Sequence, residues 1–256
     1  MLPAVSAPLV LLHGVTMSGS VWDPLRPYLE DHHVVHTPTL LGHRGGNRPP
    51  RRPVRFADVV DDVERQLDAL RLDRPHLAGN SLGGWAALEL ARRGRAASVC
   101  ALAPAGFWEP GARGRVRALE QAARLARLTR YVAPLGLSVP LVRRLSFAGV
   151  AEHGERMTAA QARRATRDLL GCTVLDELLT DDAALAPLPE PGCPVHVAWS
   201  EHDRLFPPER FAGRVAAVVP GASTEVLPGL GHVPMIDDPA AVAALVLRTT
   251  GGASDG

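Results

Sequence analysis

Residues 79–83, Gly-Asn-Ser-Leu-Gly, have the types and spacing needed for nucleophilic chemistry. They match the pattern Gly-x-Ser-x-Gly, in which a serine lies on a sharp turn between a strand and a helix, and flanking glycines avoid clashes as the backbone reverses. This turn would expose the hydroxyl of Ser81 at a helix N-terminus. The pattern alone also occurs by chance in unrelated loops, so its meaning depends on the rest of the chain.

A serine nucleophile needs a base and an acid, because its hydroxyl reacts poorly at neutral pH. Residues 222–228 are expected to form the last strand, and His232 lies in the loop after it. Residues 194–199 are expected to form the preceding strand, which is followed by Asp203. The chain order Ser81, Asp203, His232 is the one expected when nucleophile, acid and base project from loops at one end of a parallel sheet.

Each of these assignments has a competitor. Ser81 could be a turn serine without chemistry, and His232 could be one of several surface histidines, since the chain contains ten. For the acid, the position in the loop after the strand favours Asp203. Its competitors are Glu201, Asp237 and Asp238.

The remaining histidines fit structural roles. His13 and His43 are expected to brace loops by hydrogen bonding, and His202 to be solvated. His32 and His36 would lie roughly 13 Å apart along one face of a strand, too far to share an ion. We therefore expect no metal site.

Stabilisation of a developing oxyanion needs two backbone N–H donors. One comes from the residue after the nucleophile, which is Leu82. The other comes from an early loop. Residues 9–15 form an apolar run that ends in His13-Gly14 before a polar loop, so we assign the second donor to the amide of Val15.

Taken together, these motifs resemble the α/β-hydrolase superfamily, and within it the small capped esterases, lactonases and carbon–carbon bond hydrolases. The resemblance covers nearly the whole chain. It implies an α/β fold with a mostly parallel central sheet flanked by helices, and a helical cap insertion over the nucleophile. The matching segments are His13-Gly14, residues 41–46, 79–83, 201–207 and 231–239.

The pattern along the chain fits this organisation. Strand-like and helix-like segments alternate from residue 8 to about 106, with one helix expected over 56–72. The alternation then stops, and glycine and proline separate helix-like segments. We therefore predict a core of residues 1–106 and 187–256 and a cap of residues 107–186. The helices expected in the cap cover 115–130, 139–145 and 158–179.

The pocket walls are harder to identify from sequence. In relatives of this kind the cap shapes the substrate pocket, and a cap arginine that points inward could bind a carboxylate. Core packing explains the apolar candidates equally well. These candidates are Met17, Trp108, Leu205, Phe206 and Val233.

The composition argues against several classes of protein, namely nucleic-acid-binding, disulfide-stabilised and membrane-spanning proteins. The 256 residues carry a formal net charge of +1, and all 28 basic residues are arginine, so nucleic acid is not an expected partner. Three cysteines without metal-type spacing suit a reducing compartment. No stretch reaches the roughly 18 apolar residues of a membrane span. We expect a cytoplasmic protein without membrane partner, metal or cofactor.

The leading hypothesis is a serine hydrolase that cleaves a small or medium carboxylic ester or lactone through an acyl-enzyme intermediate. Serine at the elbow disfavours haloalkane dehalogenases and epoxide hydrolases, which use a carboxylate there. A carbon–carbon bond hydrolase remains open because of the Gly-Asn-Ser elbow, although many such enzymes have tryptophan where this chain has Val233. An acyltransferase and a non-hydrolytic ligand-binding or tailoring protein also remain open.

Overall fold

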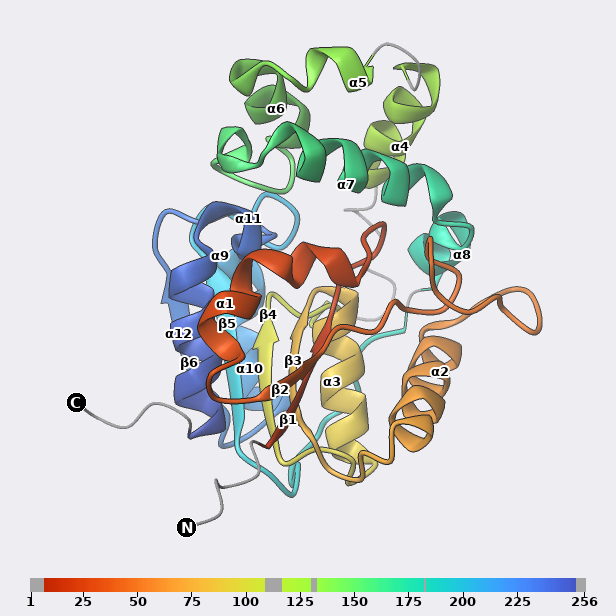
Figure 1. Cartoon of the computed structure of the whole chain (residues 1–256). Coiled ribbons are helices and arrows are strands. Elements are labelled where there is room, and N and C mark those ends of the chain that lie inside the picture. Colours follow the sequence, from red (N-terminus) through yellow and green to blue (C-terminus); the bar gives the residue numbers. More distant parts are fainter. Residues whose placement is uncertain (1–6, 109–116, 130–132, 182, 252–256) are drawn as a thin grey trace.

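The computed structural model describes residues 7–108, 117–129, 133–181 and 183–251. Its centre is a six-stranded sheet with the strand order β2-β1-β3-β4-β5-β6, and all five pairings are parallel (Figure 1). The predicted α/β fold with a parallel sheet flanked by helices is confirmed. The strands are β1 (Pro8–Leu12), β2 (Val34–His36), β3 (His76–Asn80), β4 (Ser98–Leu102), β5 (Val195–Ser200) and β6 (Ser223–Leu227).

Both faces of the sheet are covered, which explains why its inner strands are apolar throughout. In β1, Leu9 and Leu11 pack into one core cluster while Val10 and Leu12 pack into the other, as the two-residue period of a strand requires. Helices α2 (Phe56–Ala69) and α3 (Leu82–Arg92) cover the second face. The first face carries η1 (Gly19–Leu25), α1 (Arg26–Leu29), α11 (Pro234–Asp237) and α12 (Pro239–Thr250).

The segment between β4 and β5 forms a helical layer above the carboxyl ends of the strands (Figure 1). It leaves the core after Gly106 and returns near Leu185, whose N–H donates to the Gly106 carbonyl at 2.8 Å. The division into core and cap at residues 107–186 stays a prediction. The helices of this layer are α4 (Arg117–Thr129), α5 (Ala133–Gly136), α6 (Pro140–Phe147), η2 (Gly154–Arg156), α7 (Ala159–Gly171) and α8 (Leu175–Thr180).

One predicted cap helix is wrong. The expected helix over 158–179 is two helices, because α7 ends at Gly171 and α8 begins at Leu175. Between them Thr173 bonds to the core: its N–H and its hydroxyl both donate to the Gly42 carbonyl, at 2.9 and 3.0 Å. This tertiary contact takes the place of helical hydrogen bonds. The ends of the helix expected over 115–130 lie outside the described residues.

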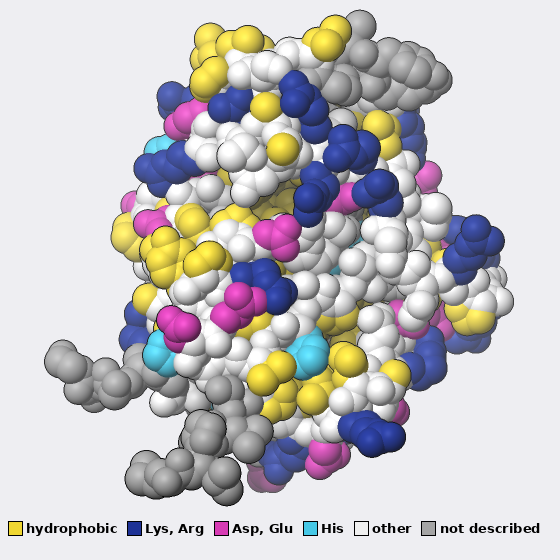
Figure 2. All heavy atoms as spheres, viewed as in Figure 1, with side chains coloured by type: hydrophobic (Ala, Val, Ile, Leu, Met, Phe, Trp, Pro, Cys, Tyr) yellow, Lys and Arg dark blue, Asp and Glu magenta, His cyan; other side chains and the backbone are white. Residues whose placement is uncertain are grey.

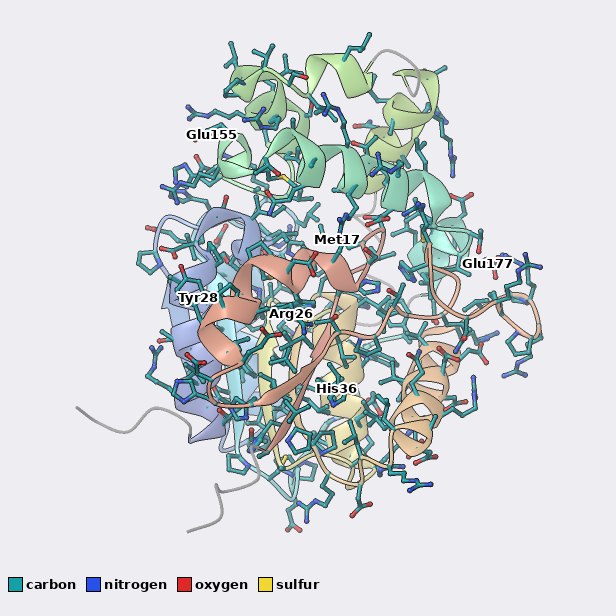
Figure 3. All side chains as sticks on the ribbon, viewed as in Figure 1. Met17, Arg26, Tyr28, His36, Glu155 and Glu177 are labelled. Atoms are coloured by element: carbon teal, nitrogen blue, oxygen red, sulfur yellow. The ribbon has the colours of Figure 1, made fainter. Side chains whose placement is uncertain are left out.

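The layer above the sheet is also tied to the core through α8. Glu177 pairs with Arg52 and accepts the N–H of Val54, in the segment before α2. Figure 3 shows Glu177 on the side of the molecule where this segment lies, and Met17 below the helical layer that lies above the sheet. The short helices after β5 are α9 (Pro208–Phe211), η3 (Ala212–Arg214) and α10 (Val215–Val218).

The expected strand around His32 is shorter than predicted. Both His32 and His33 donate their N–H to the Leu29 carbonyl in the turn after α1, so β2 begins only at Val34. Of His32 and His36, which were expected to lie on one strand, only His36 does. Within the described ranges, no group of three acidic, histidine or cysteine side chains could hold a metal ion. The helices of those ranges are all too short or too polar to cross a bilayer.

Candidate active site

Ser81 lies in the strand-to-helix turn that the sequence predicted. Its backbone has φ 55° and ψ −115°, a conformation that is strained for a residue with a side chain. A Cβ on Gly79 would lie 2.2 Å from the Gly83 carbonyl oxygen, and one on Gly83 would lie 2.0 Å from the Leu12 carbonyl oxygen. Both glycines are therefore required by close backbone contacts.

Hydrogen bonds hold this turn in place. The N–H of Ser81 donates to the Leu102 carbonyl at 2.9 Å. Asn80 is 1% exposed, and its side-chain amide donates to the carbonyls of Leu102 and His232, at 3.2 and 2.9 Å. Asn80 thus ties the serine turn to the loop after β6. The sequence does not predict this contact, although a polar residue between an apolar strand and the serine is a signal of a specific role for Asn80.

His232 and Asp203 are in direct contact at the carboxyl end of the sheet. His232 Nδ1 lies 2.7 Å from Asp203 Oδ2, and the two residues are 4% and 3% exposed. The other carboxylate oxygen accepts the N–H groups of Leu205 and Phe206, at 2.8 and 2.7 Å. These bonds fix the carboxylate, which in turn fixes the imidazole ring through Nδ1 and leaves the other ring nitrogen, Nε2, without a hydrogen bond to a described residue.

The competing acids lie in other contacts. Glu201 accepts the N–H of Gly229 at 2.8 Å. Asp238 caps α12 by accepting the N–H of Ala241 at 2.9 Å. Asp237 is buried but accepts backbone N–H groups instead of bonding the ring of His232. Asp203 is therefore the acid that contacts His232.

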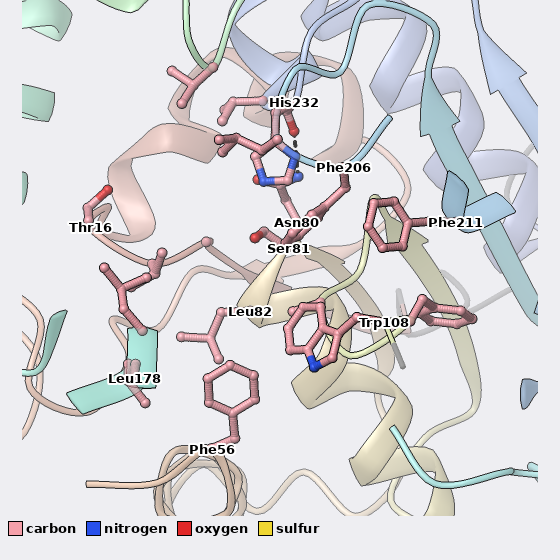
Figure 4. Close-up of a pocket in the computed structure, with 18 of the residues that line it drawn as sticks. Thr16, Phe56, Asn80, Ser81, Leu82, Trp108, Leu178, Phe206, Phe211 and His232 are labelled. Atoms are coloured by element: carbon pink, nitrogen blue, oxygen red, sulfur yellow. Dashed lines mark hydrogen bonds between the residues drawn. The ribbon is translucent and has the colours of Figure 1, made fainter. Parts of the chain in front are cut away.

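Ser81, His232 and the assigned oxyanion residues line one cavity (Figure 4). The hydroxyl of Ser81 makes no hydrogen bond with any described residue, so its contact with His232 would have to form when substrate binds; long contacts of this kind are common in empty active sites. The N–H groups of Val15 and Leu82 likewise donate to no other described residue. Two donors therefore remain available beside the serine.

The early loop is held by a histidine brace. His13 accepts the N–H of Leu40 at its Nε2, at 3.0 Å, so the proton lies on Nδ1, which donates to the Gly14 carbonyl at 2.8 Å. Burial, and to a lesser extent the neighbouring His43, lowers the pKa of His13 well below its usual value, which keeps the ring neutral. His43 Nδ1 bonds the Leu41 carbonyl at 3.0 Å. The predicted bracing roles of both histidines are confirmed.

The cavity has a volume of about 330 Å³ and mostly apolar walls. Phe206 packs against the ring of His232, with centroids 5.0 Å apart, and against Trp108 at 5.8 Å. The structure thus brings all five candidate wall residues to the cavity that holds Ser81 and His232: Met17, Trp108, Leu205, Phe206 and Val233.

Sequence reasoning missed other wall residues. Phe56 begins α2 and Leu178 belongs to α8, and neither position differs in sequence from an ordinary core residue. Asp181 also lines the cavity, where its oxygens accept the N–H groups of Phe56 and Ala183 at 2.8 and 3.2 Å. The other missed wall residues include Phe107, Leu179, Arg210, Phe211 and Arg214.

Comparisons with known proteins agree with this architecture. A sequence model described as the alpha/beta hydrolase family matches residues 9–245. The chain is 34% identical over 197 residues to "Epoxide hydrolase EphH" of Mycobacterium tuberculosis, covering 74% of this chain and 92% of that protein. It is 22% identical over 251 residues to "Carboxylesterase YbfK" of Bacillus subtilis, covering 96% and 80%.

Solved structures give the same picture at the level of the fold. A thermophilic esterase from Thermogutta terrifontis superposes with a TM-score of 0.72 at 22% identity, covering 96% of this chain and 89% of that one. A meta-cleavage product hydrolase from Pseudomonas fluorescens IP01 also gives a TM-score of 0.72, at 18% identity, covering 97% and 92%. At these identities the likeness shows the fold alone.

Proposed function

This chain belongs to the α/β-hydrolase family and is a hydrolase, and from that premise we propose that it cleaves a small or medium carboxylic ester or lactone through an acyl-enzyme on Ser81. The observation that carries the proposal is the 2.7 Å contact of Asp203 with His232, which lines the same cavity as Ser81. The two available N–H groups of Val15 and Leu82 support it.

In the proposed reaction, Nε2 of His232 removes the proton from Ser81 as its Oγ attacks the carbonyl carbon. The negative oxygen is stabilised by the amides of Val15 and Leu82, and Asp203 stabilises the imidazolium. His232 then protonates the leaving alcohol, whose departure leaves the acyl-enzyme. Water, deprotonated by His232, attacks the ester carbonyl, and the acid leaves as Ser81 recovers its proton.

The cavity supports the proposed substrate size. A volume of about 330 Å³ with aromatic and aliphatic walls lies at the small end of ligand pockets. We propose that the core of residues 1–106 and 187–256 supplies the chemistry and the cap of residues 107–186 shapes the pocket. We further propose a cytoplasmic enzyme that needs no metal or cofactor and has no nucleic-acid or membrane partner.

The relative at 34% identity favours a second candidate, epoxide hydrolysis. Attack by Ser81 on an epoxide would form an alkyl ether, which has no carbonyl for water to attack, so the enzyme would not turn over. Epoxide opening would instead need water that His232 activates directly, with Asp203 as its partner. The two functions therefore differ in their dependence on the Ser81 hydroxyl.

The test is hydrolysis of p-nitrophenyl esters from acetate to decanoate, with styrene oxide as an epoxide probe, by wild type and Ser81→Ala. We expect ester turnover to fall at least about 10³-fold in the variant. Ser223→Ala is the matched control, because Ser223 is exposed at the opposite end of the sheet.

Three results separate the candidates. Loss of ester turnover in Ser81→Ala, with turnover retained in Ser223→Ala, supports the serine mechanism. Ester turnover that survives in that variant contradicts it. Styrene oxide hydrolysis that persists without the hydroxyl supports the epoxide candidate.

A further inference from the structure

Asp237 is a buried carboxylate outside the proposed triad. It ends α11, five residues after His232, and is 1% exposed. Its Oδ2 accepts the N–H of Gly231 at 2.7 Å and that of Glu152 at 3.1 Å, and its Oδ1 accepts the N–H of His153 at 2.6 Å. The carboxylate thus joins the residue before His232 to a segment of the layer above the sheet.

The two segments are also in tight backbone contact. A Cβ on Gly231 would lie 2.9 Å from both Ala151 Cα and the Glu152 nitrogen, so only glycine fits there without a shift. On the other side of His232, the N–H of Val233 donates to the Val150 carbonyl at 2.8 Å. Segment 150–153 therefore holds the residues on both sides of His232.

We propose that Asp237 is a positioning residue that locks the His232 loop to segment 150–153, so that the seating of the cap and the placement of the His232 ring depend on one carboxylate. The role at His232 rests on the proposed function, while the structural lock does not. Removing the carboxylate would leave the buried N–H of Gly231 and the half-buried N–H groups of Glu152 and His153 without their charge-assisted acceptor. The ring of His232 would then lose its fixed position relative to Ser81.

Two variants test the contact between the His232 loop and segment 150–153, one by changing the carboxylate and the other by changing the backbone contact. Asp237→Asn keeps the shape but turns an amide NH₂ toward backbone donors, and Gly231→Ala forces the two segments apart while keeping the carboxylate. Asp238→Asn is the matched control, since this neighbouring carboxylate only caps α12. All variants are compared at temperatures well below their unfolding midpoints, with folding checked by circular dichroism.

The first readout is kinetic, on the p-nitrophenyl ester that the wild type hydrolyses best. We expect both variants to lower kcat by about 10- to 100-fold, because a small misplacement of a catalytic group has effects of this size. The KM of a small ester should change little. A merely structural role would lower the unfolding temperature and leave kcat of the folded enzyme unchanged, which overturns the proposal.

The second readout is hydrogen exchange, which needs no activity. Asp237→Asn should speed amide exchange both at residues 231–233 and at residues 152–153, and Asp238→Asn at neither. If exchange rises in both segments while wild type hydrolyses no ester, the proposed function fails and the lock stands. If exchange in Asp237→Asn matches wild type, the lock itself is wrong.

Discussion

The loops at the carboxyl ends of the strands and the helices above them are built differently. At these strand ends the polar side chains of Asp203, His232 and Asn80 are buried. Backbone groups hold the side chains of Asp203 and Asn80, and the Asp203 carboxylate holds the ring of His232. In the helical layer above the sheet, by contrast, six of the ten exposed large apolar side chains of the described residues lie between Leu125 and Leu145. Figure 2 shows hydrophobic and arginine side chains together on this upper part of the molecule.

This difference indicates which parts of the molecule place side chains most exactly. The proposed chemistry requires groups placed to fractions of an ångström, and the loops supply this through strands that end side by side in a parallel sheet. A cap that shapes a pocket needs only apolar walls of suitable size. Substitutions in the loops, or in segment 150–153 that contacts them, should therefore change the reaction rate. Substitutions in the apolar pocket walls that the proposed cap contributes should change substrate preference.

The largest effect is expected from Asp203→Asn. The remaining side-chain oxygen can still accept the N–H groups of Leu205 and Phe206, so the fold should persist. The amide, however, favours the wrong tautomer of His232, and kcat should fall by about 10⁴-fold. Steady-state kinetics measure this, with Glu201→Gln as the matched control. Equal losses in both variants would show that the loop, and not the Asp203 carboxylate, sets the rate.

The sequence predicted the loops better than the cap for a physical reason. Ser81, Asp203 and His232 each follow an apolar strand, and parallel strands must bring such loops to one edge of the sheet. The contacts of Asn80 and Asp237 could not be predicted in this way, because they depend on which backbone groups come within reach after folding.

The contacts of the helical layer above the sheet could not be predicted from the sequence either. Helical periodicity cannot reveal that Thr173 leaves the helix to bond with Gly42, nor that Phe56 and Leu178 face the cavity. These positions carry ordinary core residues, and only the packed structure distinguishes them.

A smaller effect is expected on stability, from a buried loop histidine. Burial lowers the pKa of His43 to about 4 from its usual 6.5. As the pH falls below 6.5, His43 becomes protonated in the unfolded chain. In the folded protein it stays neutral until the pH reaches about 4. The free energy of unfolding is therefore unaffected by His43 above pH 6.5. It decreases by about 3 kcal/mol through this one group as the pH falls from 6.5 to 4.

Urea unfolding at pH 7.5 and 4.5 measures this loss. In His43→Asn, which keeps a donor for the Leu41 carbonyl, the loss between the two pH values should be smaller than in wild type. His32→Asn, at an exposed position without a side-chain hydrogen bond among the described residues, is the control. An unchanged loss in His43→Asn would mean that another group causes the acid sensitivity.

The smallest effect is expected from the cap, where Leu178 lines the cavity and is 3% exposed. Leu178→Val removes one methylene from the wall, which should change the preference between short and long acyl chains by about tenfold. The kcat of the best ester should be unchanged. Leu128→Val, at a position that is 77% exposed, should change neither quantity. If Leu178→Val instead lowers kcat for every ester equally, the pocket wall at Leu178, and not segment 150–153 alone, contributes to the placement of the catalytic groups. The contrast between the two regions is then weaker than their hydrogen bonding indicates.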